Sequence, residues 1–219
     1  MKSLLNPDSP VMSFWKKLTD FVILNVLWAL GCLPVITIGT STAAMHRCVM
    51  QYQRCGEISI FKEFWKDYRR NFKQATALFL VEVVAACVFF IDIRIVWGFE
   101  TETGVLNVIW IAALFLLLIP AMSVVLPLQA QFENSFFETL KKAWLMAMVH
   151  LRSVLLVTLL NLLPVFLAVF MPQIFLKSLI FWLLFGRVLL AYLGDFILLR
   201  VFQKHVENPE EWNKQRLDA

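Results

Sequence analysis

Five polar residues lie inside long apolar stretches of this 219-residue chain, and they are the residues best placed to do chemistry. They are Asn25, Glu82, Asn161, Arg187 and Asp195. If the stretches cross a bilayer, an ionisable group at its centre costs roughly 2.5–3.5 kcal/mol, so such groups are usually paired, hydrated or functional. Two interpretations follow: an intramembrane pair that fixes helix packing, or a polar pathway or substrate site.

The depths of these residues favour a particular pair. Counted from the basic ends of their segments, Glu82 lies about 10 Å deep and Arg187 about 18 Å deep, at a rise of about 1.5 Å per residue. The long arginine side chain can close much of that gap, so we expect an ion pair between Glu82 and Arg187. Asp195, which follows Arg187 on the same segment, is the competing partner.

No enzyme motif accompanies these residues. The chain has no HExxH, no glycine-rich phosphate loop and no GxSxG, which carry metalloprotease, nucleotide and acyl-transfer chemistry. His46 with Cys48 and Cys55 has none of the common zinc spacings. The sequence therefore predicts no catalytic residue, no metal site, no cofactor and a non-enzymatic role.

Composition sets the class of the protein. The chain is 60% apolar and only 16% charged, with a mean hydropathy of +0.72, whereas soluble domains are about 45–50% apolar and about 25% charged. The net charge is +4, but the Lys and Arg residues concentrate between the apolar stretches, as membrane insertion requires. We expect a lipid bilayer as the main partner, and no nucleic acid.

The pattern predicts an all-α integral membrane helical bundle that forms one domain over residues 1–219. About five transmembrane helices are expected, with one or two interfacial amphipathic helices, and the spans fall at residues 21–39, 75–99, 105–131, 149–171 and 174–199. Nineteen residues at about 1.5 Å each cross a hydrocarbon core of about 30 Å. Pro34 and Gly39 interrupt the first span, which either crosses the bilayer or dips in and returns.

The basic segment 41–74 separates the first two spans. Its second half, from residue 57, has aromatic residues at helical spacing and five cations that could contact a cytoplasmic partner: Lys62, Lys66, Arg69, Arg70 and Lys73. This pattern is typical of an amphipathic helix lying on the membrane face. The alternative is a helix packed on the bundle.

The distribution of Lys and Arg sets the orientation. Segment 41–74, the connector 132–148 and the tail 200–219 are basic, while the loops 100–104 and 172–173 have no Lys or Arg. Basic segments stay on the cytoplasmic side, so we expect a multi-pass cell-membrane protein with a cytoplasmic C-terminus. The NPEEW stretch in the tail predicts a helix start.

Several blocks of the sequence resemble a known family. NPDSP near the start, LPVITIGTSTAA, IFKEFWKDYRRNFKQA and LLRVF near the end are similar to the YesL-like bacterial membrane proteins. The resemblance implies a small multi-span protein of Gram-positive-type bacteria, often encoded beside sugar-uptake transporters and their regulators. It implies no established activity and no catalytic residues.

Two functions are expected from these observations. The first is a non-enzymatic accessory protein of carbohydrate uptake or sensing, which contacts a sugar transporter or a membrane sensor through its basic helix. The alternative is a small transporter or channel, in which Pro34, Pro120, Pro127 and Pro164 mark broken helices around a polar site. The sequence indicates neither the sugar nor the oligomeric state.

Overall fold

The computed structural model describes residues 10–56, 58–98, 104–132 and 134–205, and this part of the chain is entirely helical or connecting loop. The first half contains α1 (Pro10–Gly31), the 3-10 turn η1 (Val35–Thr37), α2 (Ile38–Cys55), α3 (Ile60–Gly98) and α4 (Gly104–Gln131). The second half contains α5 (Phe136–Val149), α6 (Leu151–Phe170), α7 (Pro172–Lys177), α8 (Leu179–Phe181), the π-helical turn η2 (Trp182–Gly186), α9 (Arg187–Phe202) and η3 (Gln203–His205).

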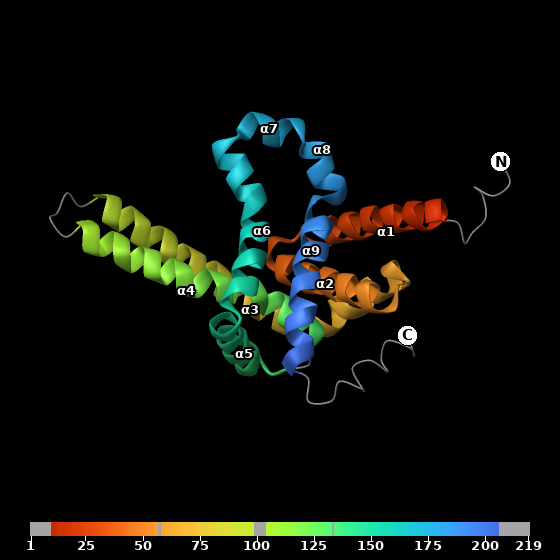
Figure 1. The fold of residues 1–219 in the computed structure, drawn as a ribbon, viewed down its shortest axis with the longest axis horizontal. Coiled ribbons are helices and arrows are strands. Elements are labelled where there is room, and N and C mark those ends of the chain that lie inside the picture. Colours follow the sequence, from red (N-terminus) through yellow and green to blue (C-terminus); the bar gives the residue numbers. More distant parts are fainter. Residues whose placement is uncertain (1–9, 57, 99–103, 133, 206–219) are drawn as a thin grey trace.

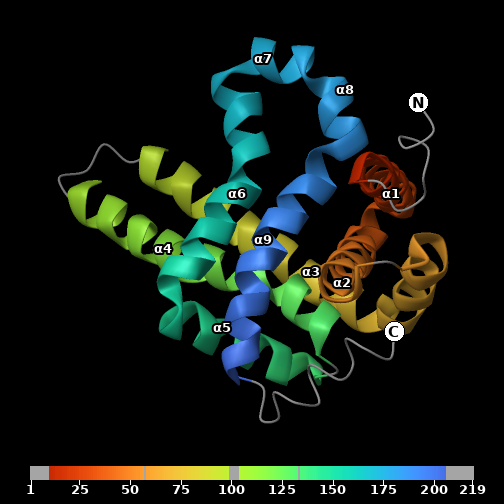
Figure 2. The same ribbon diagram turned by 45° about the vertical axis from the view of Figure 1, so that its right-hand side comes forward.

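Three arms extend from a centre formed around α2 and α9 (Figures 1 and 2). One arm is the hairpin of α3 and α4, the second is the loop that runs from α6 through α7 and α8 back to α9, and the third is α1. Two buried clusters hold the centre together. One joins α4, α5, α6 and α9, with Met50 of α2 and Leu78 of α3, and the other joins α1, α2, the start of α3 and α9.

Three described helices are long and apolar enough to cross a membrane. They are Ile60–Arg94, Leu151–Phe170 and Leu179–Phe202, and the shorter segment Leu118–Gln131 of α4 is also apolar. Large apolar side chains on these helices point outward, such as Phe90 on α3 and Val169 on α6. Exposed large apolar side chains on long apolar helices are compatible with a membrane protein.

The predicted span 21–39 is not one helix. α1 ends at Gly31 and a new helix begins at Ile38, because Pro34 cannot continue an α-helix. The Thr37 hydroxyl lies 2.8 Å from the Gly31 carbonyl oxygen and 2.7 Å from that of Pro34, and donates into this pair of acceptors. The chain therefore turns at Pro34 and runs back along the bundle as α2.

α2 approaches α3 very closely over its first turns. At Gly39, an added Cβ would lie 2.3 Å from the Phe79 Cβ and 2.6 Å from the Ala75 carbonyl oxygen. One residue further, the hydroxyls of Thr40 and Thr76 are 2.9 Å apart. Small residues at such positions let two helix backbones meet in a membrane protein, and this contact sets α2 against the middle of α3.

α3 corrects the predicted boundary between an interfacial helix 57–74 and a span 75–99. It is one helix from Ile60 to Gly98, because no glycine or proline interrupts it after it begins. Phe64 is completely buried, and Trp65 and Tyr68 pack with it against α2. The aromatic face of this segment thus packs on the bundle, as the alternative interpretation had it, although Phe61 remains exposed.

The predicted span 174–199 is also broken. α7 ends before Ser178, and the segment then passes through α8 and the π-helical turn η2 before α9 begins. The Asn25 side chain of α1 fills this turn: its amide donates to the Leu183 carbonyl oxygen at 2.6 Å and accepts from the Val188 N–H at 3.1 Å. Asn25 thereby satisfies two backbone groups that the wide turn leaves open.

The connector 132–148 contains a helix of its own, α5, which starts at Phe136. Its N-terminus is capped because the Ser135 N–H donates to the Glu138 carboxylate at 3.1 Å. The hydrogen bonds from Ser135 lower the pKa of Glu138. The acidic loop at 100–103 and the predicted NPEEW helix in the tail lie outside the described residues.

Candidate functional site

A cavity of about 340 Å³ lies between α2, α3, α4, α6 and α9. Besides three hydroxyl groups, those of Thr42, Ser123 and Thr158, four larger polar or ionisable side chains on different helices line it: His46 on α2, Glu82 on α3, Asn161 on α6 and Arg187 at the start of α9. Much of the remaining wall is apolar, and Phe89, Met122 and Leu162 contribute to it. A concave, mostly apolar site with a few convergent polar groups is the usual form of a small-molecule site.

One oxygen of Glu82 has no hydrogen-bond partner among the described residues. Its Oε1 atom is buried and accepts no hydrogen bond from any described residue. Leaving a buried acceptor unsatisfied costs roughly 1–3 kcal/mol, and more when the group is charged. An unpartnered carboxylate at the wall of a cavity therefore indicates a place for a group that the protein itself does not supply.

Arg187 does not form the predicted pair with Glu82: within the described residues no ion pair of 4 Å or less joins them. Its guanidinium instead donates to the Asn161 side-chain oxygen at 2.8 Å and lies 6.0 Å from the centre of the Trp28 ring. Depth along the helices was not sufficient to predict the partner, because the direction in which each side chain leaves its helix also matters.

Asp195, the competing partner for Arg187, binds a different residue. Its two carboxylate oxygens lie 2.8 and 2.9 Å from His46 Nδ1, and the Asp195 side chain is completely buried. Eight residues separate Arg187 from Asp195 on one helix, which corresponds to a rotation of about 80°. Asp195 therefore points to α2, while Arg187 points to α6.

His46 is the site residue that sequence reasoning missed. It was considered only with Cys48 and Cys55 as a metal cluster, and within the described part of the chain no group of three His, Cys, Asp or Glu side chains could hold a metal ion. The sequence does carry one signal: His46 follows the run of small residues 39–44, which is buried against α3. A histidine on such a face needs a partner.

The cavity wall between α4 and α6 is closed by hydroxyl groups. The Ser123 and Thr158 hydroxyl oxygens lie 2.8 Å apart, and each also lies 2.8 Å from a carbonyl oxygen of its own helix, that of Pro120 for Ser123 and that of Val154 for Thr158. One hydroxyl donates to the other, which in turn donates to its own carbonyl oxygen. These polar groups are satisfied, so Glu82 and Arg187 are the groups that a ligand would meet first. Asn25 lies in the π turn described above and does not line the cavity.

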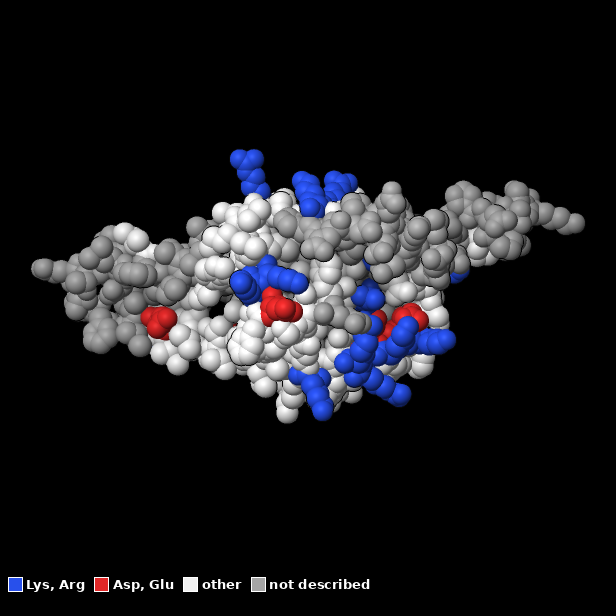
Figure 3. Space-filling model, turned by 90° about the horizontal axis from the view of Figure 1, so that it is seen from below, with Lys and Arg blue, Asp and Glu red and all other residues white. Residues whose placement is uncertain are grey.

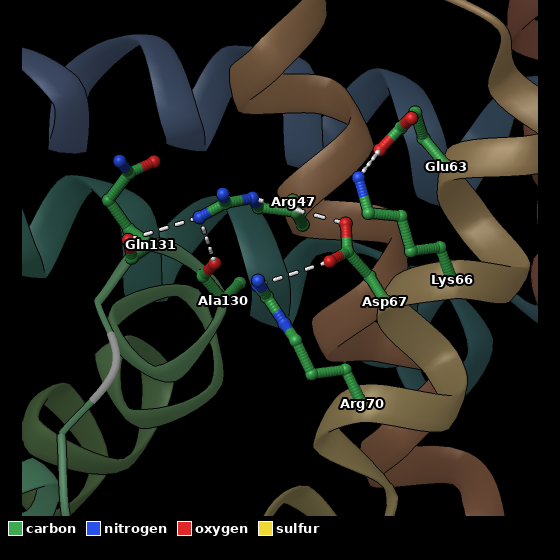
Figure 4. Close-up of polar contacts among 7 residues, drawn as sticks. All are labelled: Arg47, Glu63, Lys66, Asp67, Arg70, Ala130 and Gln131. Atoms are coloured by element: carbon green, nitrogen blue, oxygen red, sulfur yellow. Dashed lines mark hydrogen bonds and ion pairs between the residues drawn. The ribbon is translucent and has the colours of Figure 1, made fainter. Parts of the chain in front are cut away.

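A second charged cluster joins α2, α3 and the end of α4 (Figure 4). Arg47 donates to the last carbonyl oxygens of α4, at 3.0 Å to Ala130 and 3.2 Å to Gln131. Asp67 lies 3.9 Å from the Arg47 Nε and 3.1 Å from a guanidinium nitrogen of Arg70. We call Arg47, Asp67 and Arg70 the arginine clamp. A cation at a helix C-terminus is also stabilised by the helix dipole.

The five cations predicted as a cytoplasmic contact are all exposed on α3. Arg70 belongs to the clamp, and Lys66 pairs with Glu63 at 3.2 Å. The other three, Lys62, Arg69 and Lys73, form no ion pair with a described residue. Several Lys and Arg side chains of the molecule gather on the face seen from below (Figure 3).

Comparison with known proteins gives one match. Residues 21–93, which are 73 of the 219 residues, match the family described as "Protein of unknown function, DUF624". The matched segment includes His46 and Glu82 but ends before Asn161 and Arg187. It is consistent with the resemblance predicted from the sequence, and the family description carries no activity. No curated protein and no solved structure matches the chain.

Proposed function

We propose that this protein binds a small polar solute in the cavity between α2, α3, α4, α6 and α9 and carries it across the membrane. The observation that supports this function is the buried Glu82 Oε1, which faces the cavity without a hydrogen-bond donor. Ionisable groups kept inside a membrane protein commonly mark the path of a substrate or ion. The cavity also lies where a small-molecule site is expected, between helices of a bundle.

The helices around the cavity are interrupted at several points, as helices that move during transport often are. α2 follows the break at Pro34, α4 contains Pro120 and Pro127, α6 contains Pro164, and α9 follows the π-helical turn. In many transporters, interrupted helices surround the binding site, and rocking of one part against another exposes it to either side. The same arrangement supports transport here.

For the topology, we propose about five spans, formed by α1, α3, α4, α6 and the α8–α9 segment, with the basic segments in the cytoplasm. The test is a cysteine-free variant that carries single cysteines at exposed positions. Gln173→Cys in α7 should react with an impermeant thiol reagent in intact cells, whereas Lys62→Cys and Lys142→Cys should not. Labelling of Lys142→Cys from outside would contradict the orientation.

The transport proposal is tested by access to the cavity from each side of the membrane. In the cysteine-free background, Ala85→Cys lies on the cavity wall, and Ala143→Cys, which is completely buried in α5, is the matched control. Ala85→Cys should react with a small hydrophilic thiol reagent applied to either side of proteoliposomes, and the control should not. Reaction from one side only would indicate a receptor, and no reaction would exclude both roles.

A second candidate is the accessory role in carbohydrate uptake or sensing, and the exposed cations of α3 favour it. Lys62, Arg69 and Lys73 could contact a sugar transporter or a membrane sensor, since they are not neutralised within the described chain. Changing the three to Gln should leave the protein abundant but weaken crosslinking to that partner. Unchanged crosslinks would remove the support for this role. The link to carbohydrate rests on the sequence resemblance alone.

A further inference from the structure

The cavity is lined by an acidic group and a basic group that do not form an ion pair with each other. Glu82 on α3 has a buried oxygen without a donor, and Arg187 on α9 forms no ion pair of 4 Å or less within the described residues. Opposite charges attract strongly in a medium of low dielectric constant. Because the two groups line one cavity without pairing, each is available to a different end of something bound there.

Arg187 has unused capacity for an anion. A guanidinium presents five N–H donors in a flat fork, which matches the two oxygens of a carboxylate. Within the described chain it makes one hydrogen bond, to the neutral oxygen of Asn161 at 2.8 Å, besides its contact with the Trp28 ring. Asn161 and Trp28 therefore orient the fork without neutralising its charge.

The other acidic group in the neighbourhood is already occupied. Asp195 is held by His46 at 2.8 and 2.9 Å and is completely buried, so it offers no site to a ligand. His46 itself also lines the cavity. The unfilled ionic positions at the cavity wall are consequently the carboxylate of Glu82 and the guanidinium of Arg187.

The rest of the wall is suited to an apolar group. Phe89 on α3, Leu118 and Met122 on α4, and Leu162 on α6 line the space beside the two charges. The volume of about 340 Å³ fits a small organic molecule. The ligand therefore needs a cationic donor, an anionic acceptor and a short apolar part.

We propose that the cavity binds a zwitterionic, amino-acid-like solute, with its ammonium group on Glu82, its carboxylate on Arg187 and its apolar side chain against α4 and α6. This inference rests on the proposed function and gives it a class of substrate. A hydroxyl-rich neutral solute could donate to Glu82, but it would leave both charges unneutralised inside the protein, which is unfavourable.

The test measures binding by the purified full chain in lipid nanodiscs, by isothermal titration calorimetry. The probes are L-leucine, 4-methylpentanoate, which lacks the ammonium group, 3-methylbutylamine, which lacks the carboxylate, and D-glucose. L-leucine should bind, and each of the other three should bind about 100-fold more weakly or not at all, as expected when a charge-assisted hydrogen bond is lost and its partner stays buried.

Two variants assign the ends of the ligand. Glu82→Gln should reduce the preference for L-leucine over 4-methylpentanoate from about 100-fold to a few-fold, and Arg187→Gln should do the same for the preference over 3-methylbutylamine. Lys141→Gln, on the exposed face of α5, is the matched control and should keep both preferences. Because Arg187→Gln could impair folding, the wild-type probe series and Glu82→Gln are sufficient to decide.

Three results would overturn the inference: no binding of L-leucine, equal binding of L-leucine and either analogue, or binding of D-glucose alone. If these occur while Ala85→Cys is still reached from both sides of the membrane, the proposed substrate class is wrong and the transport function stands. If Ala85→Cys is also unreactive, both proposals fall together.

Discussion

Asp67 and Glu82 are two acidic residues on the same helix, α3, in opposite situations. Asp67 lies between Arg47 and Arg70, whose guanidinium nitrogens are 3.9 and 3.1 Å away. Glu82 has a buried oxygen that accepts no hydrogen bond from the described chain. Each has one buried carboxylate oxygen of this kind, Oδ2 of Asp67 and Oε1 of Glu82. The two residues differ in their ionic partners: two arginines lie within ion-pair distance of Asp67, and none in the described chain lies within that distance of Glu82. The arginine clamp therefore supports the fold, whereas we propose that Glu82 is kept at a cost for a ligand.

The largest expected effect comes from breaking the clamp. Arg47→Met should lower the free energy of unfolding by about 3 kcal/mol, since it leaves Asp67 with one partner and removes the cation from the carbonyl groups of Ala130 and Gln131. The measurement is denaturant unfolding in detergent micelles. Arg69→Met, on the exposed side of the same helix, is the control. Equal losses in both variants would mean that the clamp contributes no more than a surface charge.

The next effect tests the helix contact that lies between the two acids. Gly39→Ala should lower the free energy of unfolding by about 2 kcal/mol, because its Cβ would meet the Ala75 carbonyl oxygen at 2.6 Å and α2 would have to move away from α3. The control is Gly194→Ala, where the nearest atom is Val157 Cγ1 at 3.5 Å, an ordinary contact. We expect the control to change little. If both variants unfold alike, the close approach of α2 and α3 is not what places Glu82.

A substitution of Glu82 should change the free energy of unfolding in the opposite direction to a substitution in the clamp. Glu82→Gln should raise the free energy of unfolding by about 1 kcal/mol, since the amide avoids the cost of burying an acidic group that has no donor. The same unfolding assay, without added solute, measures it. A loss as large as that of Arg47→Met would show that Glu82 has a structural partner, and the contrast between the two acids would then fail.

The smallest effect concerns Glu138, an acidic residue that has a hydrogen-bond partner but is exposed to solvent. Hydrogen bonds from Ser135 lower the pKa of Glu138, so its contribution to stability is present above the pKa of an unfolded glutamate and is lost as the pH falls through the lower folded value. Glu138→Gln should therefore lose less stability than wild type between about pH 5 and pH 3. Thermal unfolding over that range measures it, and identical acid profiles would refute the cap as a source of stability.

The sequence was informative about the helices and their exposed apolar surfaces. α4 and α6 begin and end within two residues of the predicted spans 105–131 and 149–171, because long apolar runs between polar segments determine them. The helix breaks inside residues 21–39 and 174–199 were harder to predict from the sequence. Pro34 was visible, but the π turn after Phe181 carries no proline and depends on Asn25, which comes from another helix.

The sequence predicted only part of the residue set that lines the cavity, and it did not predict the contacts: Asn25 and Asp195 do not line the cavity, and His46, which does, was missed. Glu82, Asn161 and Arg187 do share one cavity, yet the partner of Asp195 is His46, 149 positions away. Apolar periodicity gives the face of a helix that is buried, but it does not give the side chain that meets it from a distant segment. Arg187 illustrates this limit. Its depth along the helix suggested Glu82 as its partner, but the direction of its side chain brings it to Asn161 instead.

The side-chain amide of Asn25 acts as a backbone peptide group would, because it donates one hydrogen bond to another helix and accepts one from it. It takes the place of a missing turn between the Leu183 carbonyl and the Val188 N–H, so α1 and the α8–α9 segment share a hydrogen-bonding ladder although they are far apart in the sequence. Pulling them apart would leave one carbonyl and one N–H open in an apolar environment. α1 is therefore a fixed reference for the rotation of Arg187, which directly precedes Val188, and any rearrangement of the cavity must carry the two helices together or rebuild this turn.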